Sequence, residues 1–381
     1  MSRPLQFYEF FAGGGMARLG LGAAWTCAFA NDFDPVKAAT YRDNFPDAGF
    51  QDAGGHFHEG DVWKLDPAQL PGRADLAWAS SPCQDFSLAG ARAGLTGGRS
   101  SAFFGFWKLV EALNAQGRAP RTIVVENVAG LFTSHGGADF TALCRALAGQ
   151  GYRFGALEID AARFLPQSRP RVFVIATREP VPAELIGDSP FQTRLVQEAR
   201  ARLPAELAEL WVAWRVAAPP ARNTDLASLL DPDAPCRPQA RTEALLDLMA
   251  PPHRARVEAL RRSGGRAVGG VFRRMRTEDG RKVQRAEARF DGLAGCLRTP
   301  RGGSSRQALL LIEAGAVTSR LVTAREGARL MGLPDTYRLP RAATSALHVV
   351  GDGVAVPVVR WLADQVLEPL LEPPARAVAA A

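Results

Sequence analysis

Cys83, in the stretch SSPCQDFSLAG, has a setting that suggests nucleophilic chemistry. It follows an apolar run, Ala74–Ala79, which is typical of a buried strand, so we expect the thiol at a strand end. Only a few per cent of a free thiol is ionised near neutral pH, but a nearby cation or a helix amino end raises that fraction. A thiolate is well matched to electron-poor ring carbons. The alternative is a small buried thiol without a chemical role.

Glu126 ends a β-branched run, TIVVE, and is the candidate for moving a proton. A carboxylate at the end of so apolar a strand needs a partner, and with one it can hold or deliver a proton on a heteroaromatic ring. In PQSRPRVFVIAT, Gln167, Arg169 and Arg171 recur at every second position before a strand. We expect them on one face, where two guanidinium groups could bind a carbonyl oxygen, a phosphate or Glu126. The alternatives are a glutamate that satisfies loop amides and a surface strand with alternating arginines.

A glycine-rich stretch, FFAGGGMARLGLG, suggests a nucleoside ligand. A strand runs into three glycines and a helical start, which lets backbone amides approach a ligand closely. Asp32 follows Gly13 by 19 residues at the end of a second strand, where a carboxylate suits a ribose diol. The glycine spacing differs from G-x-G-x-x-G, which favours an adenosyl ligand without a pyrophosphate. Asp61, in GDVWKLD, could accept from an adenine amine. A tight turn and an exposed turn aspartate remain the alternatives.

The elements around these groups alternate between strands and helices. The predicted strands are Leu5–Phe11, Trp25–Ala30, Asp75–Ala79, Thr122–Glu126, Phe154–Asp160 and Arg171–Thr177. The predicted helices are Pro35–Asn44, Phe103–Ala115 and Asp139–Gln150. Strands separated by helices indicate an α/β fold with a doubly wound, mostly parallel sheet. Periodicity does not fix the order of the strands.

The composition shifts after about residue 180, where proline-rich punctuation begins. We expect a second, smaller domain over residues 180–344, with 1–179 and 345–381 forming the first. The basic stretch Arg261–Phe290 favours short strands and glycine loops within the second domain. The tail, His348–Leu367, has the pattern of a turn followed by an apolar helix that could pack on the first domain.

The net charge of +7 is unevenly distributed. Residues 250–310 contain 15 Lys and Arg against 5 Asp and Glu, a local charge of +10 that leaves −3 for the remainder. A basic segment on a slightly acidic remainder indicates a polyanion partner contacted mainly by one part of the chain. A solvated arginine-rich surface is the alternative.

Composition disfavours several other classes of protein. The chain is 47% hydrophobic and 22% charged, as in ordinary soluble proteins, and no apolar run approaches the roughly 18 residues of a membrane helix. The amino terminus has no signal-peptide layout. Five cysteines without a C-x-x-C pair suggest neither a zinc site nor a disulfide framework: Cys27, Cys83, Cys144, Cys236 and Cys296. We expect a reduced cytoplasmic protein that uses no metal.

In order and placement, these motifs resemble those of the DNA cytosine-5 methyltransferases, of the bacterial restriction-modification or orphan type. FAGGG with Asp32 resembles the family's S-adenosylmethionine loop and ribose acid, and SPCQDFS its catalytic Pro-Cys-Gln motif. ENV at Glu126–Val128 and Gln167-Ser-Arg169-Pro-Arg171 resemble two further catalytic motifs. Arg289–Gln307 with Thr323–Pro340 is similar to the regular part of the target-recognition domain, and Val350–Val359 to the last motif.

The sequence departs from the family pattern at four residues. Met16 follows Gly15 where a second glycine is usual, and Asp352 stands in place of an asparagine; both bear on the cofactor pocket. Ser80-Ser81 replaces a glycine and an apolar residue before the catalytic cysteine. None of these changes removes a catalytic group.

The resemblance implies a Rossmann-like catalytic domain, a target-recognition domain and a set of site residues. The implied catalytic residues are Cys83, Glu126, Arg169 and Arg171. The implied cofactor residues are Phe11, Ala12, Gly13, Gly14, Gly15, Asp32, Phe33, Asp61, Val62 and Pro82, with Phe33 against the adenine and Asp61 and Val62 at its edge. The expected DNA contacts are Gln84, Gln167, Arg273, Arg274, Arg276 and Arg285.

The implied reaction is methylation of carbon 5 of cytosine in a specific duplex DNA sequence. Cys83 would attack carbon 6 of a flipped-out base, Glu126 would hold a proton at ring nitrogen 3, and S-adenosylmethionine would become S-adenosylhomocysteine. We expect a monomer, free of membrane and associated with the nucleoid, and a cognate restriction endonuclease is a possible partner.

Three other functions are open. One is a transfer RNA methyltransferase of the same family, although the Cys-Phe-Thr stretch of that branch is absent. A nicotinamide oxidoreductase would explain the glycines and Asp32 but not Cys83 and Glu126. A non-catalytic DNA-binding relative would not need either of the latter residues.

Overall fold

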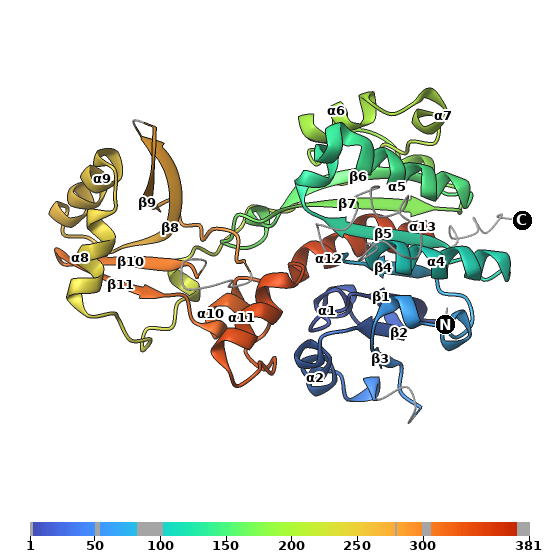
Figure 1. Cartoon of the computed structure of the whole chain (residues 1–381), viewed down its shortest axis with the longest axis horizontal. Helices are drawn as coiled ribbons and strands as arrows, with labels where there is room; N and C mark the ends of the chain where they lie inside the picture. The colour runs from blue at the N-terminus through green and yellow to red at the C-terminus, as the bar shows by residue number, and fades with distance from the viewer. Residues whose placement is uncertain (1–2, 50–53, 82–101, 279, 299–305, 372–381) are drawn as a thin grey trace, which may run out of the picture. The chain divides into compact units, whose positions relative to one another are not determined.

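The computed structural model describes residues 3–49, 54–81, 102–278, 280–298 and 306–371. The chain forms two compact units (Figure 1). The first contains Met1–Asp160, Pro170–Pro220 and Val354–Ala381, and the second contains Ala161–Arg169 and Ala221–Gly353. These limits differ from the expected ones at 180 and 344: the first unit continues to Pro220, and the second begins with a short segment before Pro170.

A seven-stranded sheet forms the centre of the first unit. Its strands are β1 (Leu5–Phe10), β2 (Trp25–Asp32), β3 (Phe57–Glu59), β4 (Leu76–Ala79), β5 (Thr122–Asn127), β6 (Arg153–Asp160) and β7 (Pro170–Thr177). Their order is β3-β2-β1-β4-β5-β7-β6, with β7 antiparallel to both of its neighbours. The expected α/β class and mostly parallel sheet are confirmed. The order reverses between β1 and β4, and sheets of this kind bind ligands at the carboxyl ends of the strands near such a point.

Helices surround this sheet. They are α1 (Met16–Leu21), α2 (Pro35–Asn44), α4 (Ala102–Ala115), α5 (Ala138–Gly149), α6 (Arg194–Ala201), α7 (Ala205–Ala208), α12 (Val356–Leu362) and α13 (Glu368–Leu371). Short 3-10 turns cover Pro46–Ala48, Val62–Lys64, Pro67–Gln69, Ala129–Phe132, Ser134–Gly137 and Ala183–Leu185, and a π turn covers Ala363–Leu367. Helix α2 begins where the pattern predicts, because the Asp34 carboxylate accepts from the amides of Val36 and Lys37 and Pro35 occupies the first turn.

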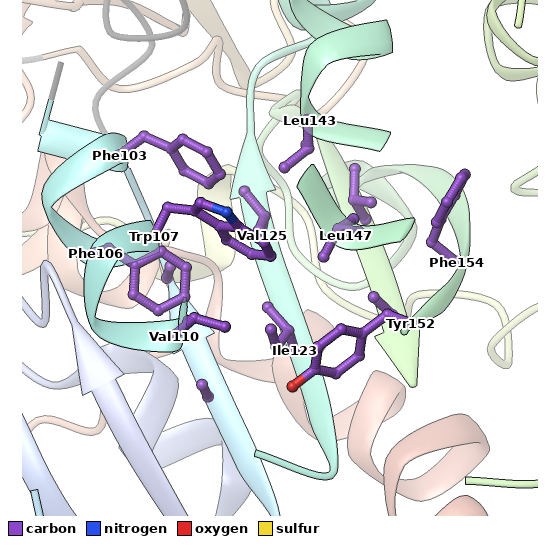
Figure 2. Close-up of a cluster of buried hydrophobic side chains, with 14 of the residues drawn as sticks. Phe103, Phe106, Trp107, Val110, Ile123, Val125, Leu143, Leu147, Tyr152 and Phe154 are labelled. Carbon is purple, nitrogen blue, oxygen red and sulfur yellow. The ribbon is translucent and has the colours of Figure 1, made fainter. Parts of the chain in front are cut away.

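An apolar core joins α4 and α5 to the sheet. Figure 2 shows Phe103, Phe106 and Trp107 of α4 facing Ile123 and Val125 of β5. Every residue of β5 is buried, which is why its sequence is a continuous β-branched run. This packing fixes the position of β5, and with it the carboxylate at the strand's end.

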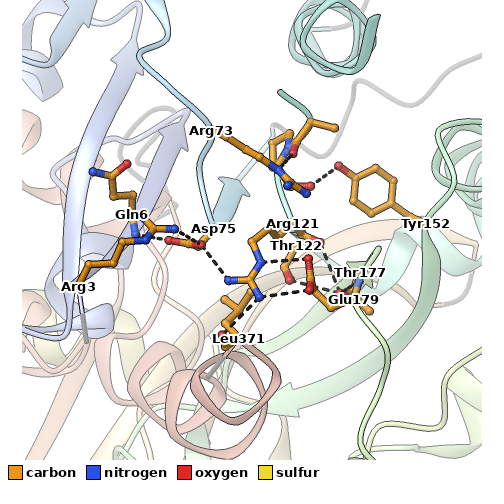
Figure 3. A network of polar contacts seen from close by, with 12 residues as sticks. Arg3, Gln6, Arg73, Asp75, Arg121, Thr122, Tyr152, Thr177, Glu179 and Leu371 are labelled. Atoms are coloured by element: carbon orange, nitrogen blue, oxygen red, sulfur yellow. Dashed lines mark hydrogen bonds and ion pairs between the residues drawn. The ribbon is translucent and has the colours of Figure 1, made fainter. Parts of the chain in front are cut away.

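The amino ends of the strands are held by a polar network, drawn in Figure 3. Arg121, which precedes β5, donates to Asp75 at 3.0 Å and to Glu179 at 3.0 Å, and Asp75 also accepts from the amide of Gln6 at 2.9 Å. Arg3 donates to the same buried carboxylate. These bonds fasten the edge of the sheet opposite the carboxyl ends of the parallel strands.

The second unit is built on a four-stranded antiparallel sheet in the order β11-β10-β8-β9. Its strands are β8 (Ala267–Glu278), β9 (Arg281–Arg289), β10 (Ala308–Glu313) and β11 (Ala316–Leu321). Its helices are α8 (Gln239–Asp247), α9 (Pro251–Arg262), α10 (Ala324–Arg329) and α11 (Ala343–Asp352), with 3-10 turns at Ala161–Arg163 and Ala227–Leu229. Helices α8 and α9 bury Leu245, Leu246 and Val257 against one face of the sheet, together with Met249 from the segment between them. The basic stretch therefore forms a long hairpin rather than short strands.

One helical stretch in the described part of the chain, Ala343–Leu371, passes a length and composition test for a membrane span. In that stretch 61% of the most apolar window is buried, and the buried core helices of soluble proteins pass the same test. Residues 353–355 interrupt the helix between α11 and α12.

Candidate active site

The glycine loop after β1 has the backbone that its residues predict. Phe11, Gly13 and Gly15 have positive φ angles of 57°, 56° and 79°. A Cβ at Gly15 would lie 2.3 Å from the ring of Phe45, so only glycine fits there. A Cβ at Gly13 would meet nothing within 4 Å, so open space lies in front of this residue. Phe11 is a bulky residue in the left-handed region, which is a strained conformation that tends to occur at functional sites.

Asp32 lies at the end of β2 and holds this loop. Its carboxylate accepts from the amide of Gly13 at 2.8 Å and from the amide of Asp34 at 2.9 Å. Burial raises the pKa of this carboxyl group, against the lowering effect of the Lys37 charge and the two amides. Each oxygen receives one backbone amide and retains capacity for a further donor, as binding of a ribose diol requires.

Asn31 is a site residue that the sequence analysis missed. Its side-chain nitrogen donates to the carbonyls of His58 at 3.0 Å and Gly60 at 2.8 Å, while its own carbonyl accepts from Ala12 at 2.9 Å. The ends of β1, β2 and β3 are thereby joined through one residue. The sequence feature that could have identified Asn31 is its place as a second polar residue, next to Asp32, at the end of a buried strand.

The other expected cofactor residues surround this edge of the sheet. Phe33 is 70% exposed, although it is a large aromatic residue directly after a buried strand. Asp61 is exposed, lies just beyond β3 and accepts from the amide of Trp63 at 3.1 Å, whereas Val62 is buried. The expected cofactor residue Pro82 lies outside the described residues.

Glu126 and Arg171 form an ion pair, with 3.1 Å between Nε of Arg171 and Oε1 of Glu126. Glu126 is only 7% exposed, so its charge requires such a partner. The pair forms because β7 runs antiparallel to β5, which brings the first residues of β7 to the carboxyl end of β5. Of the three targets considered for these arginines, Glu126 is the one that Arg171 contacts here.

The segment that leads toward Cys83 is also held at this edge. Ser80 donates its amide to the carbonyl of Phe10 and accepts from the indole of Trp78 at 3.0 Å. Asn127 donates to the carbonyl of Ser81 at 3.2 Å and lies next to Glu126 in β5. The two serines thus fasten the end of β4 to β1 and β5. Cys83 and Gln84 lie outside the described residues.

Gln167 and Arg169 do not share a strand face with Arg171, so that expectation is wrong. Strand β7 begins at Pro170, and both residues belong to the second unit. Gln167 is fully buried and donates to the carbonyl of Leu330 at 2.6 Å, a position at odds with the expected DNA contact. Arg169 is buried and donates to the carbonyls of Leu297, Gly351 and Gly353. Through these contacts Arg169 holds together the segments at Leu297 and at residues 351–353, which is a structural role. Its catalytic role stays a prediction.

The four arginines expected to contact DNA all lie on the β8–β9 hairpin. Arg274 and Arg276 pair with Glu287, and Arg285 pairs with Glu278 at 2.8 Å. These pairs are partly exposed, and ion pairs of this kind contribute little to stability, so the guanidinium groups can exchange partners at low cost. Arg273 lies on the other face of the hairpin, opposite Ala286.

A buried polar cluster lies behind the glycine loop. Glu9 of β1 accepts from the hydroxyl of Tyr41 at 3.1 Å, and the guanidinium of Arg18 lies 4.3 Å from the ring centroid of Phe45. Burial raises the pKa of Glu9 to about 8 and that of Cys27 to about 12. Within the described ranges, no three His, Cys, Asp or Glu side chains gather in a way that could hold a metal ion.

Comparison with known proteins supplies the context for this geometry. The model of the family "C-5 cytosine-specific DNA methylase" matches residues 5–368. The Type II methyltransferase M.DsaV of Dactylococcopsis salina is 26% identical, with 96% of this chain and 86% of the relative aligned. M.NlaX of Neisseria lactamica, also a Type II methyltransferase, is 26% identical over 94% of each protein. The S. pombe Dnmt2 methyltransferase structure has a TM-score of 0.59 and 18% identity, covering 96% of this chain and 99% of that one. This last likeness shows the fold alone.

Proposed function

The chain belongs to the C-5 cytosine-specific DNA methylase family, and from that premise we propose that it transfers a methyl group from S-adenosylmethionine to carbon 5 of cytosine within a specific sequence of duplex DNA. The observation that carries the proposal is the Glu126–Arg171 ion pair at the carboxyl end of β5. Asn127, the neighbour of Glu126 in β5, donates to Ser81, and Ser81 precedes Cys83 by two residues.

The described residues at the ends of β1, β2 and β3 fit an adenosyl cofactor. Open space in front of Gly13 leaves room for a ligand, and the Asp32 carboxylate is available to ribose hydroxyl groups. The exposed ring of Phe33 offers a surface for the adenine. Asp61, which would accept from the adenine amine, follows Gly60, whose amide donates to the carbonyl of Asp32. When bound, S-adenosylmethionine supplies an electrophilic methyl group.

The protein's own groups prepare the cytosine for that methyl group. Carbon 5 of cytosine is a poor nucleophile, and addition of the Cys83 thiolate at carbon 6 makes carbon 5 enamine-like. Glu126 holds a proton at ring nitrogen 3, which favours the addition. Arg171 keeps Glu126 in place and lies where a guanidinium can bind the ring carbonyl. Loss of the carbon 5 proton after methylation then expels the thiolate.

The substrate must present its cytosine outside the base stack. Carbon 6 of a stacked base is inaccessible to a thiolate, so the enzyme acts on a flipped-out nucleotide. The arginine-rich hairpin of the second unit provides phosphate contacts and a reading element of a size that the major groove admits. We place the enzyme in the cytoplasm on nucleoid DNA, as a monomer, with a restriction endonuclease of the same specificity as a partner.

Duplex DNA containing 5-fluorocytosine tests this proposal. Fluorine at carbon 5 blocks the final elimination, so incubation with cofactor should yield a covalent protein–DNA adduct that survives denaturation. Cys83→Ser should abolish the adduct. The matched control is Cys236→Ser, because Cys236 is an exposed thiol in the second unit, and this variant should retain the adduct.

Two results would contradict the assignment. An adduct that persists in Cys83→Ser would exclude this nucleophile. An adduct with fluorinated transfer RNA and none with DNA would exclude DNA as the substrate and favour the transfer RNA methyltransferase instead.

A further inference from the structure

The β8–β9 hairpin continues beyond the sheet as a two-stranded ribbon. Strand β10 pairs with β8 only from Ala267 to Val271, while the β8–β9 pairing continues to Glu278 and Arg281. Figure 1 shows the two strands extending past the end of β10. A ribbon of this width is one of the two elements that the major groove of DNA accommodates.

The two faces of the ribbon differ in charge. Side chains alternate along each strand, and directly paired residues share a face. The face that includes Arg274 and Arg285 also carries Glu287 and Glu278, which pair with its arginines. The opposite face carries, in the described part of the ribbon, Arg273, Met275, Thr277, Lys282 and Gln284, without an acidic residue.

Met275 and Gln284 are directly paired at the middle of this acid-free face. Met275 is 58% exposed, although it is a large apolar residue. Gln284 is half-buried, and its side-chain amide forms no hydrogen bond to any residue that the structure describes. An apolar side chain and an amide therefore stand side by side on a face that also carries Arg273 and Lys282, and Met275 lies outside the apolar core that the described residues of this unit form.

The chemistry of this pair matches one base pair. A glutamine amide donates to N7 and accepts from the amino group of adenine, whereas an apolar side chain contacts the methyl group of thymine. Both features lie in the major groove and on the two halves of the same A·T pair. Cross-strand neighbours have Cβ atoms about 5 Å apart, so a single base pair or two successive ones lie within their reach.

We propose that the Met275–Gln284 pair reads an A·T base pair in the recognised DNA sequence, with Met275 against the thymine methyl group and Gln284 on the adenine edge. The inference rests on the proposed function, since it names a feature of the substrate of that same enzyme. Arg273 and Lys282 on the same face bind the flanking phosphates.

The experiment has two stages. Bisulfite sequencing of DNA from cells that express the wild-type chain gives the methylated sequence, which should contain a fixed A·T pair. Synthetic duplexes then carry uracil for that thymine, which removes the methyl group, or 7-deazaadenine for that adenine, which removes N7. Each analogue removes only part of the contact, so each should lower the wild-type kcat/KM by less than the roughly five- to hundredfold that loss of a whole bidentate contact costs.

Variants assign each effect to its residue. With Met275→Ala the uracil duplex should be methylated as fast as the thymine duplex, while the 7-deazaadenine penalty remains. With Gln284→Ala the reverse should hold. The matched control is Gln239→Ala, which changes an exposed glutamine of the same unit and should retain both penalties. Unchanged S-adenosylhomocysteine affinity and thermal midpoint show that each variant is folded.

The outcomes separate this inference from the proposed function. If the wild-type protein methylates no cytosine in DNA, the proposed function fails, and the inference with it. If it methylates DNA but the sequence has no fixed A·T pair, or both variants retain both penalties, only the inference is overturned.

Discussion

The charge state of a buried carboxylate in the first unit depends on the partners that surround it. Glu126 is buried and ion-paired with Arg171, so its carboxylate has a fixed direction at the strand end. Glu9 is buried as well, and among the described residues its carboxylate accepts from the hydroxyl of Tyr41 and, weakly, from the amide of Arg18. Desolvation therefore dominates at Glu9 and raises its pKa to about 8.

We expect Glu9→Gln to remove a pH dependence of stability. Because the pKa of Glu9 in the folded protein exceeds its ordinary value of 4.5, the folded state retains a proton that the unfolded chain releases. The wild-type free energy of unfolding should therefore fall as pH rises toward 8, by at most about 1.4 kcal/mol per pH unit. Urea denaturation at several pH values checks the slope, which should disappear in Glu9→Gln.

The pH window and a control sharpen that measurement. Burial lowers the pKa of His56 to about 4 from 6.5, which produces an opposite slope that fades as the pH rises through 6.5, so the difference between the wild-type and Glu9→Gln slopes isolates Glu9. Glu111 is exposed on α4, and Glu111→Gln should follow the wild-type slope. A Glu9→Gln slope equal to that of the wild type would refute the burial argument.

At the scale of elements, the site depends on how neighbouring strand ends are joined. Asn31 connects β2 to the segment after β3 and to the glycine loop after β1. Asn127 connects β5 to the end of β4. These bonds hold the loops after neighbouring strands together. The Asp32 and Glu126 carboxylates therefore keep their positions at the strand ends.

Asn31→Ala should weaken cofactor binding more than it affects the fold. The change leaves the carbonyls of His58 and Gly60 without their donor, which costs about 1–3 kcal/mol and frees the segment that carries Asp61. Titration calorimetry with S-adenosylhomocysteine should show a rise in Kd of roughly five- to hundredfold, by the same free-energy scale.

Asn114→Ala is the matched control for that measurement. Asn114 donates to Gln150 at 2.6 Å, away from the glycine loop, and its loss should lower stability without changing the cofactor Kd. Equal Kd changes in the two variants would mean that Asn31 has no specific effect on the cofactor site.

At the scale of the whole molecule, positive charge is concentrated in one of the two units. Burial and the nearby charges of Arg273, Arg241 and Arg306 lower the pKa of Arg237, which shows that several cations gather around this residue. The ribbon adds Arg274 and Arg276 in exchangeable surface pairs. Such a distribution suits a polyanion and predicts a strong dependence on salt.

Replacing Arg274 and Arg276 together by alanine should reduce this dependence. Each phosphate contact that is lost lowers the slope of log K against log salt by roughly 0.9, irrespective of DNA sequence. Fluorescence anisotropy with a non-specific duplex at several salt concentrations checks the slope. Arg194→Ala, which removes an exposed arginine from α6 of the first unit, should leave it unchanged. An unchanged slope in the double variant would exclude these arginines from the DNA interface.

Local sequence patterns were sufficient to predict the helices and strands and the chemical groups at their ends. The continuous β-branched run predicted β5, the helical pattern from Pro35 predicted α2, and the glycine-rich stretch predicted a turn between β1 and a helix. These features depend on residues close together in the chain, so periodicity and turn chemistry reveal them. Asp32 and Glu126 were identified in this way, whereas Phe33 was named only through the family resemblance.

The partners of those groups were decided only by the tertiary structure. Alternation along PQSRPRVFVIAT placed Gln167, Arg169 and Arg171 on one face, yet the strand begins after Arg169, and only Arg171 pairs with Glu126. That pairing requires β7 to run antiparallel beside β5, and periodicity encodes which face a side chain takes but neither the neighbour nor the direction of its strand. The sequence alone determined which groups stand at the strand ends, and the packing of distant segments decided which of them meet.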